Sequence, residues 1–278
     1  MNYLKDYREG EKFVGTYLCK QKQILKTKAG KTYYSLTLQD KTGTADGKIW
    51  ELNNGIANFE PMDYIHCEGM VTSFQGNLQM NISRVRISDE GEYDPADYVP
   101  CTNKDVGEMF SRILKYVASV QNKYLRKILE MYFVENKEFV DAFKKHSAAK
   151  SVHHGFMGGL LEHTLSVTDM CQYFAEHYPM IHRDLLITAA LFHDMGKIQE
   201  ISDFPMNDYT DDGQLLGHIY IGARCMENAA AQIPNFPPKL KNELVHCILA
   251  HHGKMEFGSP KVPAIMEAMA LHLSLIQI

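Results

Sequence analysis

The sequence lacks the marks of a membrane protein, of a secreted protein and of a disulfide-stabilised protein. No apolar run reaches the about 18 residues of a membrane span, and residues 1–15 contain no secretory hydrophobic segment. The six cysteines lie far apart and form no Cys-x-x-Cys pair, which argues against a zinc ribbon and a disulfide framework. We therefore expect reduced thiols, a cytoplasmic location and no membrane association.

An excess of positive charge is also absent. The chain of 278 residues has 29 Lys and Arg residues against 34 Asp and Glu residues, which gives a net charge of −5. A net negative charge excludes a protein whose whole surface is basic, as is typical of proteins that bind nucleic acid without sequence specificity. A local basic region remains, because residues 12–50 contain eight lysines and only two acids.

Histidine is almost absent from the N-terminal part of the chain. Of the thirteen histidines only His66 precedes residue 145, and the other twelve lie between residues 146 and 272. Such a change in composition indicates two domains, and an acidic, aperiodic segment with turn residues separates them. We predict a first domain at 1–88, a linker at 89–104 and a second domain at 105–278.

The N-terminal part has the pattern of a small β module. Residues 12–88 alternate between apolar and polar side chains and are interrupted by turn residues such as Asp40-Lys-Thr-Gly43. This pattern predicts about five short strands. Strands of this number and length suit a closed barrel of the OB-fold type, with an SH3-like barrel as the alternative.

This module has candidate residues for binding single-stranded nucleic acid. Five of its lysines lie within twelve residues that contain no acid, namely Lys20, Lys22, Lys26, Lys28 and Lys31. Three aromatic residues nearby are candidates for stacking on bases: Tyr33, Trp50 and Phe74. We expect single-stranded nucleic acid, RNA or DNA, as the partner, and self-association is left open. The competing interpretation places the aromatic side chains in the barrel core and the lysines in a solvated loop.

From residue 105 onward, apolar residues recur at the i, i+3 and i+4 spacing of α-helices. The pattern predicts an all-α second domain and thus an α+β protein of two domains. Helices are predicted at 106–120, 123–133, 136–146, 160–178, 184–193, 214–233, 239–252 and from 264 onward.

Several of these predicted helices carry histidine, and in one case aspartate, close to an end. The candidates are His163, His193, Asp194, His218, His251 and His252. Asp194 follows an almost wholly apolar helix, where a carboxylate is unfavourable for the helix dipole and costly to bury. A divalent cation bound by Asp194 and neighbouring imidazoles would remove both costs, and a ligand set without thiolate is typical of hydrolytic metal sites. The alternative is that these histidines are structural.

Four segments in this order resemble the HD superfamily of metal-dependent phosphohydrolases. They are His153-His-Gly-Phe-Met-Gly-Gly-Leu-Leu-Glu-His163, Ala190-Leu-Phe-His-Asp-Met-Gly-Lys197, Leu216-Gly-His218 and Ile248-Leu-Ala-His-His-Gly253. With the β module that precedes them, they resemble the YhaM-type 3′-to-5′ exoribonucleases, which carry an OB-fold followed by an HD domain. The resemblance covers nearly the whole chain and implies a metal-dependent exoribonuclease.

The resemblance also implies a site for two divalent cations, with Mn²⁺ as the expected ion. The implied ligands of the first cation are His163, His193 and Asp194. The implied ligands of the second are Asp194, which bridges, His218 and one or both of His251 and His252. Two such cations would activate a water for in-line attack on phosphorus. The resemblance to exoribonucleases implies nucleoside 5′-monophosphates as the products.

Three further residues are implied to act on the substrate. Lys197 would neutralise a phosphate oxygen beside Asp194, which makes these two the expected catalytic residues. His153 and His154 would belong to the substrate pocket.

One position departs from the HD pattern. HD enzymes have a metal-binding Asp on the last core helix, but Leu275 stands at that place and no Asp or Glu follows Glu267. We therefore expect that the C-terminal part of the HD domain is missing, that the first metal site is weakened and that activity is reduced. Two other functions remain as alternatives: an HD hydrolase of small nucleotides, and a catalytically impaired protein that binds single-stranded nucleic acid.

Overall fold

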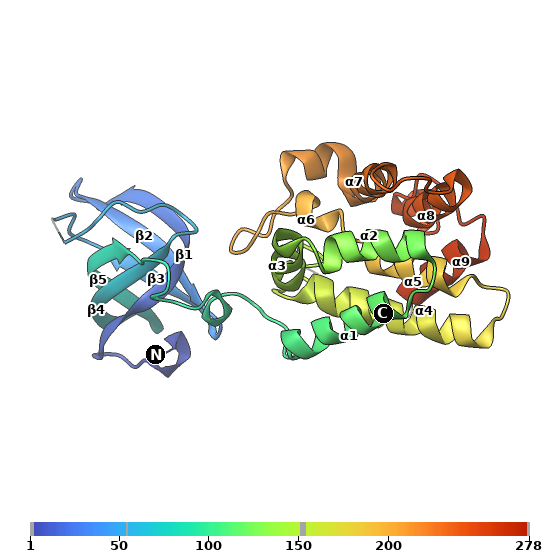
Figure 1. Cartoon of the computed structure of the whole chain (residues 1–278). Coiled ribbons are helices and arrows are strands. Elements are labelled where there is room, and N and C mark those ends of the chain that lie inside the picture. Colours follow the sequence, from blue (N-terminus) through green and yellow to red (C-terminus); the bar gives the residue numbers. More distant parts are fainter. Residues whose placement is uncertain (1–2, 54, 151–153, 277–278) are drawn as a thin grey trace. The chain divides into compact units, whose positions relative to one another are not determined.

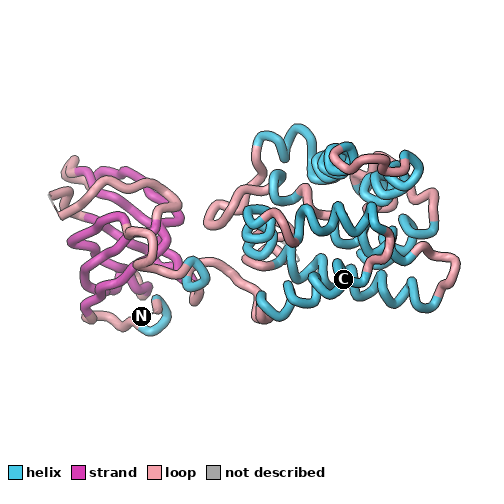
Figure 2. Tube along the Cα trace, in the orientation of Figure 1, coloured by secondary structure: helices cyan, strands magenta, loops and turns pink. Residues whose placement is uncertain are grey.

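The computed structural model describes residues 3–53, 55–150 and 154–276 of the chain. The chain divides into two compact units, Met1–Pro100 and Cys101–Ile278. The first unit consists mainly of strands and the second of helices, as Figures 1 and 2 show. The division falls inside the segment predicted as a linker, 89–104.

Five strands of the first unit form a closed barrel (Figure 1). They are β1 (Lys12–Lys26), β2 (Thr32–Asp40), β3 (Gly43–Ile49), β4 (Tyr64–Phe74) and β5 (Asn77–Ile87). The strand order is β1-β2-β3-β5-β4, and β4 closes the barrel against β1. The pairs are antiparallel apart from β3–β5, which is parallel. This is the topology of the OB-fold, so the prediction of an OB-like barrel is confirmed.

The period-two alternation of the strands divides their side chains between the barrel core and the outside. On β2, Leu36 and Leu38 are 1% and 0% exposed, whereas Ser35 and Thr37 on the other face are only partly buried. Tyr33 shares the outer face with Ser35 because it lies two residues before it. The outer face of β2 is therefore where an aromatic side chain of this strand can meet a ligand.

Residues 89–100, which the sequence places in a linker, pack on the barrel. The ring of Tyr93 stacks on that of Tyr64 with centroids 4.0 Å apart, and Tyr98 is only 1% exposed. The ammonium of Lys41 lies 2.7 Å from a carboxylate oxygen of Asp97. Two buried or stacked tyrosines in an aperiodic acidic segment give no periodic signal, which is why the sequence pattern does not show this packing.

Helices make up the second unit, as the sequence predicts. They are α1 (Val106–Ser119), α2 (Lys123–Phe133), α3 (Lys137–Lys145), α4 (Gly159–His177), α5 (Arg183–Phe192), α6 (Lys197–Glu200), α7 (Asp211–Ala231), α8 (Pro238–Ala250) and α9 (Met266–Ile276). Within the described ranges, no helix combines the length and the apolar character needed to cross a membrane. The six cysteines all lie in the described part of the chain and form no disulfide.

Helix α5 runs through the interior of the second unit and brings the two polar residues that follow it into that interior. It contacts α2, α4, α8 and α9, and every side chain from Leu185 to Phe192 is buried. A helix covered on all sides is apolar on all sides, as this sequence is. The two residues that follow it, His193 and Asp194, are consequently 0% and 2% exposed.

Candidate metal centre

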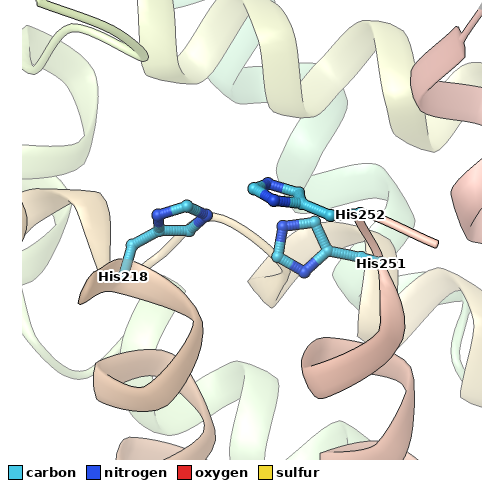
Figure 3. A group of neighbouring side chains, drawn as sticks. All are labelled: His218, His251 and His252. Atoms are coloured by element: carbon cyan, nitrogen blue, oxygen red, sulfur yellow. The ribbon is translucent and has the colours of Figure 1, made fainter. Parts of the chain in front are cut away.

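The six candidate ligands predicted from the sequence lie together in the helical unit. Helix α4 supplies His163, the end of α5 supplies His193 and Asp194, α7 supplies His218, and the end of α8 supplies His251 and His252. Figure 3 shows His218 facing the pair that follows α8. Four helices that are distant in the sequence thus present imidazole and carboxylate groups to one place.

One oxygen of Asp194 faces the first group of ligands. Its Oδ2 lies 3.3 Å from Nε2 of His163 and 3.3 Å from Nε2 of His193. The two nitrogens lie 3.2 Å from each other. Ligands at roughly 2.0–2.2 Å from one cation are separated from each other by about this much, so the triangle has the size of a coordination site.

The other oxygen of Asp194 faces the second group. Its Oδ1 lies 3.4 Å from Nε2 of His218 and 3.6 Å from Nε2 of His251. These three atoms are buried and have no hydrogen-bond partner among the described residues. A buried polar atom without a partner costs roughly 1–3 kcal/mol. One divalent cation would satisfy all three atoms, so the residues present fit a bound metal.

His252 completes the second group. Its ligand nitrogen and those of His218 and His251 all lie within 4.8 Å of one another, and the three rings point toward a common space in Figure 3. Helix α8 ends at Ala250, so the two histidines come one after the other where the helix stops. The second group thus offers three imidazoles besides Asp194.

Hydrogen bonds on the far side of three rings leave their Nε2 atoms available as ligands. Each Nδ1 bonds to a backbone carbonyl: His193 to Ala190 at 2.8 Å, His251 to Ile248 at 2.6 Å and His252 to Phe257 at 2.8 Å. A carbonyl oxygen only accepts, so each Nδ1 carries the hydrogen. The lone pair of each neutral ring is then on Nε2, which faces the site.

The protonation states also suit a metal centre. Burial opposes ionisation of Asp194, but the nearby Lys197 ammonium and the imidazoles hold the pKa of this carboxyl well below its usual range. Burial lowers the pKa of His163 and of His252, and it lowers the pKa of His251 to about 3. At neutral pH the site therefore presents an ionised carboxylate together with neutral imidazoles of His163, His251 and His252, the forms that bind cations.

Lys197 lies where the sequence predicts a phosphate-binding cation. It begins α6, three residues after Asp194, and its Nζ is 3.0 Å from Oδ2 of that residue. The same Nζ donates to the carbonyl of Ala148 at 2.6 Å. The two contacts hold the ammonium beside the candidate ligands.

The remaining expected site residues of the helical unit have different outcomes. The ring of His154 lies 5.2 Å from that of His163, centroid to centroid, and His153 lies outside the described residues. Leu275 is partly buried and packs against the apolar core, so it adds no ligand. Sequence reasoning also missed Glu200, whose Oε1 lies 2.9 Å from Nδ1 of His218. No motif or periodicity singled out this carboxylate.

The barrel brings together two of its three candidate aromatic residues. The rings of Tyr33 and Trp50 stack with centroids 4.6 Å apart, and Trp50 Nε1 donates to Oδ1 of Asn81 at 3.0 Å. Lys48, which the sequence analysis did not single out, lies two residues before Trp50 and therefore on the same face. Phe74 is exposed and lies at the tip of the β4–β5 hairpin. This tip adjoins the start of β3, whereas Trp50 follows the end of that strand.

The candidate lysines do not form one patch with these aromatic residues. Lys22 already makes cation–π contacts: its Nζ lies 4.8 Å and 4.4 Å from the ring centroids of Tyr34 and Phe59. Tyr34 is on the face of β2 opposite to that of Tyr33, so Lys22 lies away from Tyr33. The exposed lysines of this stretch are Lys20, Lys26, Lys28 and Lys31. Lys31 pairs with Glu51 across 3.3 Å. Lys20, Lys26 and Lys28 thus remain as the candidates for contacts with the phosphate groups of a nucleic acid.

Comparison with known proteins identifies the family. An HD domain model matches residues 160–273. The 3′-5′ exoribonuclease YhaM of Geobacillus sp. (strain WCH70) is 32% identical, and the match covers 87% of this chain and 74% of the relative. The chain belongs to the YhaM family. The resemblance inferred from the sequence is thereby confirmed.

Two further relatives also match most of this chain. YhaM of Listeria innocua is 32% identical over 97% of this chain and 85% of its own length, and YhaM of Bacillus subtilis (strain 168) is 31% identical over 87% and 77%. Among solved structures, the second OB-fold domain of replication protein A from Methanococcus maripaludis covers 33% of this chain and 98% of its own, with 20% identity and a TM-score of 0.27.

Proposed function

We propose that this chain is a metal-dependent 3′-5′ exoribonuclease that hydrolyses single-stranded RNA to nucleoside 5′-monophosphates. The observation that carries the proposal is the division of the Asp194 carboxylate between two groups of ligands, with Oδ1 unpaired in the interior. Family membership supplies the substrate class, since the curated relatives are named 3′-5′ exoribonucleases. Mn²⁺ is the metal we expect.

In this proposal Asp194 would supply one ligand oxygen to each of two cations. Its Oδ2 belongs to the group with His163 and His193, and its Oδ1 to the group with His218 and the two histidines after α8. When bound, the two cations activate a water for attack on phosphorus and stabilise the charge on the leaving oxygen. The first group has three described protein ligands and the second has four, so the first cation is expected to bind more weakly.

The protein's own side chains hold the substrate. Lys197 offers its ammonium to a phosphate oxygen next to the carboxylate of Asp194, and the role we propose for His153 and His154 is to bind the nucleotide. In the barrel, Tyr33 and Trp50 stack on bases while Lys20, Lys26 and Lys28 contact phosphates. An OB-fold presents its ligand face on these central strands. We place the protein in the cytoplasm, where cysteines that form no disulfide, as the six of this chain, persist in reduced form.

Three substrates test the proposal with the same protein in Mn²⁺. RNA labelled at its 5′ end should shorten progressively and release mononucleotides, and RNA blocked at its 3′ end should resist. Hydrolysis of free nucleotides without shortening of RNA would select the small-nucleotide hydrolase instead. A gel shift of RNA without any turnover would select the catalytically impaired binding protein.

A further inference from the structure

His218 begins the second half of an interrupted helix. Helix α7 has a non-helical residue at Gly217, with φ 73° and ψ 153°, a backbone conformation that glycine adopts without strain. The N–H groups that follow the interruption have no carbonyl acceptor within the helix, as at the start of any helix. Oε1 of Glu200 accepts the N–H of His218 at 2.9 Å. This carboxylate therefore acts as the N-terminal cap of the second half of α7, where the helix dipole favours a negative charge.

The same oxygen also binds the ring of His218. Nδ1 lies 2.9 Å from Oε1 of Glu200, and both residues are largely buried, at 8% and 9% exposure. A carboxylate accepts, so Nδ1 must donate and Nε2 keeps its lone pair. That Nε2 is the unpaired atom 3.4 Å from Oδ1 of Asp194. One oxygen thus fixes both the backbone and the ring of a candidate ligand.

Glu200 is held in this position by its own backbone. Its carbonyl accepts the N–H of Thr210 at 3.0 Å, and a Cβ on Gly213 would lie 2.1 Å from the carbonyl oxygen of Glu200. On the other side, a Cβ on Gly196 would lie 2.1 Å from the carbonyl oxygen of His218. The backbones around α6 and α7 are therefore in direct contact at two glycines, which fixes the backbone of Glu200 relative to that of His218.

His218 differs in one respect from the other histidines with a described Nδ1 bond in the site. His193, His251 and His252 donate to neutral backbone carbonyls, whereas His218 donates to a carboxylate. A carboxylate partner makes an imidazole a stronger donor to a metal, and loss of such a partner typically costs about 10–100-fold in metal affinity. We propose that Glu200 is a positioning residue that fixes the ring and tautomer of His218 and strengthens its bond to a divalent cation.

The proposal rests on the proposed function insofar as that function supplies the metal. Two variants separate the possible contributions of Glu200. Glu200→Ala removes both the acceptor and the charge, whereas Glu200→Gln keeps an acceptor oxygen and removes only the charge. Glu267→Ala is the matched control, because Glu267 is an equally buried carboxylate, at 8% exposure, which caps the N–H of His182 and touches no candidate ligand.

Calorimetric titration of the metal-free full chain with Mn²⁺ gives the first readout. We expect Glu200→Ala to weaken one of the two sites about 10–100-fold and to leave the other within a few-fold of wild type. Glu200→Gln should fall between the two, and Glu267→Ala should match wild type. Equal affinities for Glu200→Ala and Glu267→Ala at both sites would overturn the proposal.

Nitrogen NMR of the histidine rings in the metal-free protein gives a second readout that needs neither metal nor RNA. His218 should be in the Nδ1–H form in wild type and in Glu200→Gln, and a mixture of tautomers in Glu200→Ala. An unchanged Nδ1–H form in the alanine variant would overturn the positioning role. A wild-type protein that bound no Mn²⁺ would overturn the proposed function and the metal part of this proposal, while the ring signals would still decide whether Glu200 orients His218.

Discussion

Lys197 lies one helical turn beyond Asp194, and its ammonium is 3.0 Å from the same carboxylate oxygen that faces His163 and His193. The ammonium and a cation bound at these ligands would therefore share one oxygen. Two positive charges at such a distance repel each other in a buried site. A phosphate oxygen of the substrate placed beside both of them would relieve this repulsion, which gives Lys197 a role that depends on the substrate.

Asp194→Ala should abolish hydrolysis. The carboxylate is buried and lies within 3.6 Å of four imidazole nitrogens. Its removal therefore takes one candidate ligand oxygen from each of the two groups. Loss of a residue that only hydrogen-bonds to a metal ligand costs up to about 100-fold in activity. Because Asp194 is itself a candidate ligand, we expect turnover of RNA to fall by more than about 100-fold. The control is Asp169→Ala, which breaks an ion pair with Arg112 elsewhere in the unit. Wild-type turnover of Asp194→Ala in Mn²⁺ would refute the metal centre.

Lys197→Met should reduce turnover without weakening metal binding. Loss of one preorganised charge at a reacting phosphate typically costs about 10²–10³-fold in rate. The affinity for Mn²⁺ should stay the same or rise, because the variant lacks an ammonium 3.0 Å from a ligand oxygen. Single-turnover kinetics and calorimetry on Lys197→Met and Lys197→Arg check this. Parallel losses of affinity and rate would show that the lysine only supports the fold.

The burial of the candidate ligands His193 and Asp194 was predictable because its signal is local. Asp194 and the preceding His follow a helix that is apolar on all sides, and such a helix brings whatever comes next into the interior. The barrel was predictable for a similar reason, since the alternation around Leu36 and Leu38 continues over a whole strand.

Other features depend on contacts between distant segments. Glu200 caps the N–H of His218 because Gly217 interrupts α7 and leaves that N–H without a helical partner. Lys22 was a candidate phosphate ligand, but the strand register places it over the ring of Tyr34, away from Tyr33. Neither the interruption nor the register has a signature in the sequence around these residues.

Acid should destabilise the metal-free protein well before its carboxylates are protonated. Burial lowers the pKa of His163 and His252, and that of His251 to about 3. In the unfolded chain these rings take up protons near pH 6.5, whereas the native rings remain neutral. The unfolded state then binds more protons, so stability falls as pH drops from 6.5 toward the native pKa, by up to about 1.4 kcal/mol per pH unit for each ring.

Urea unfolding in the presence of a chelator measures this dependence. The free energy of unfolding should decline between about pH 7 and about pH 5, and the decline should be shallower in His251→Gln, which removes one of the rings that stays neutral. A free energy that is constant or rises on acidification over this range would contradict the assignment of neutral buried imidazoles.

Trp50→Ala should weaken the binding of single-stranded RNA by about 1–3 kcal/mol, the usual value for one stacked base. Trp50 is 40% exposed and is held by Tyr33 and Asn81 on the outer face of the barrel. Phe74→Ala is the matched control, because Phe74 is more exposed, at 61%, but lies at the other end of β3. Fluorescence anisotropy with labelled RNA compares the two. Equal losses, or a loss only in Phe74→Ala, would move the binding face away from Trp50.

The exposed lysines should determine how RNA binding depends on salt. Each phosphate contact contributes about 0.7 to the slope of log affinity against log salt for a single strand. Replacing Lys20, Lys26 and Lys28 by Gln should therefore lower the magnitude of this slope by up to about 2 in total. Lys22→Gln is the internal control, because its ammonium already contacts the rings of Tyr34 and Phe59. Binding titrations at several salt concentrations distinguish the variants, and an unchanged slope in the triple variant would show that these three lysines are solvated side chains with no phosphate contact.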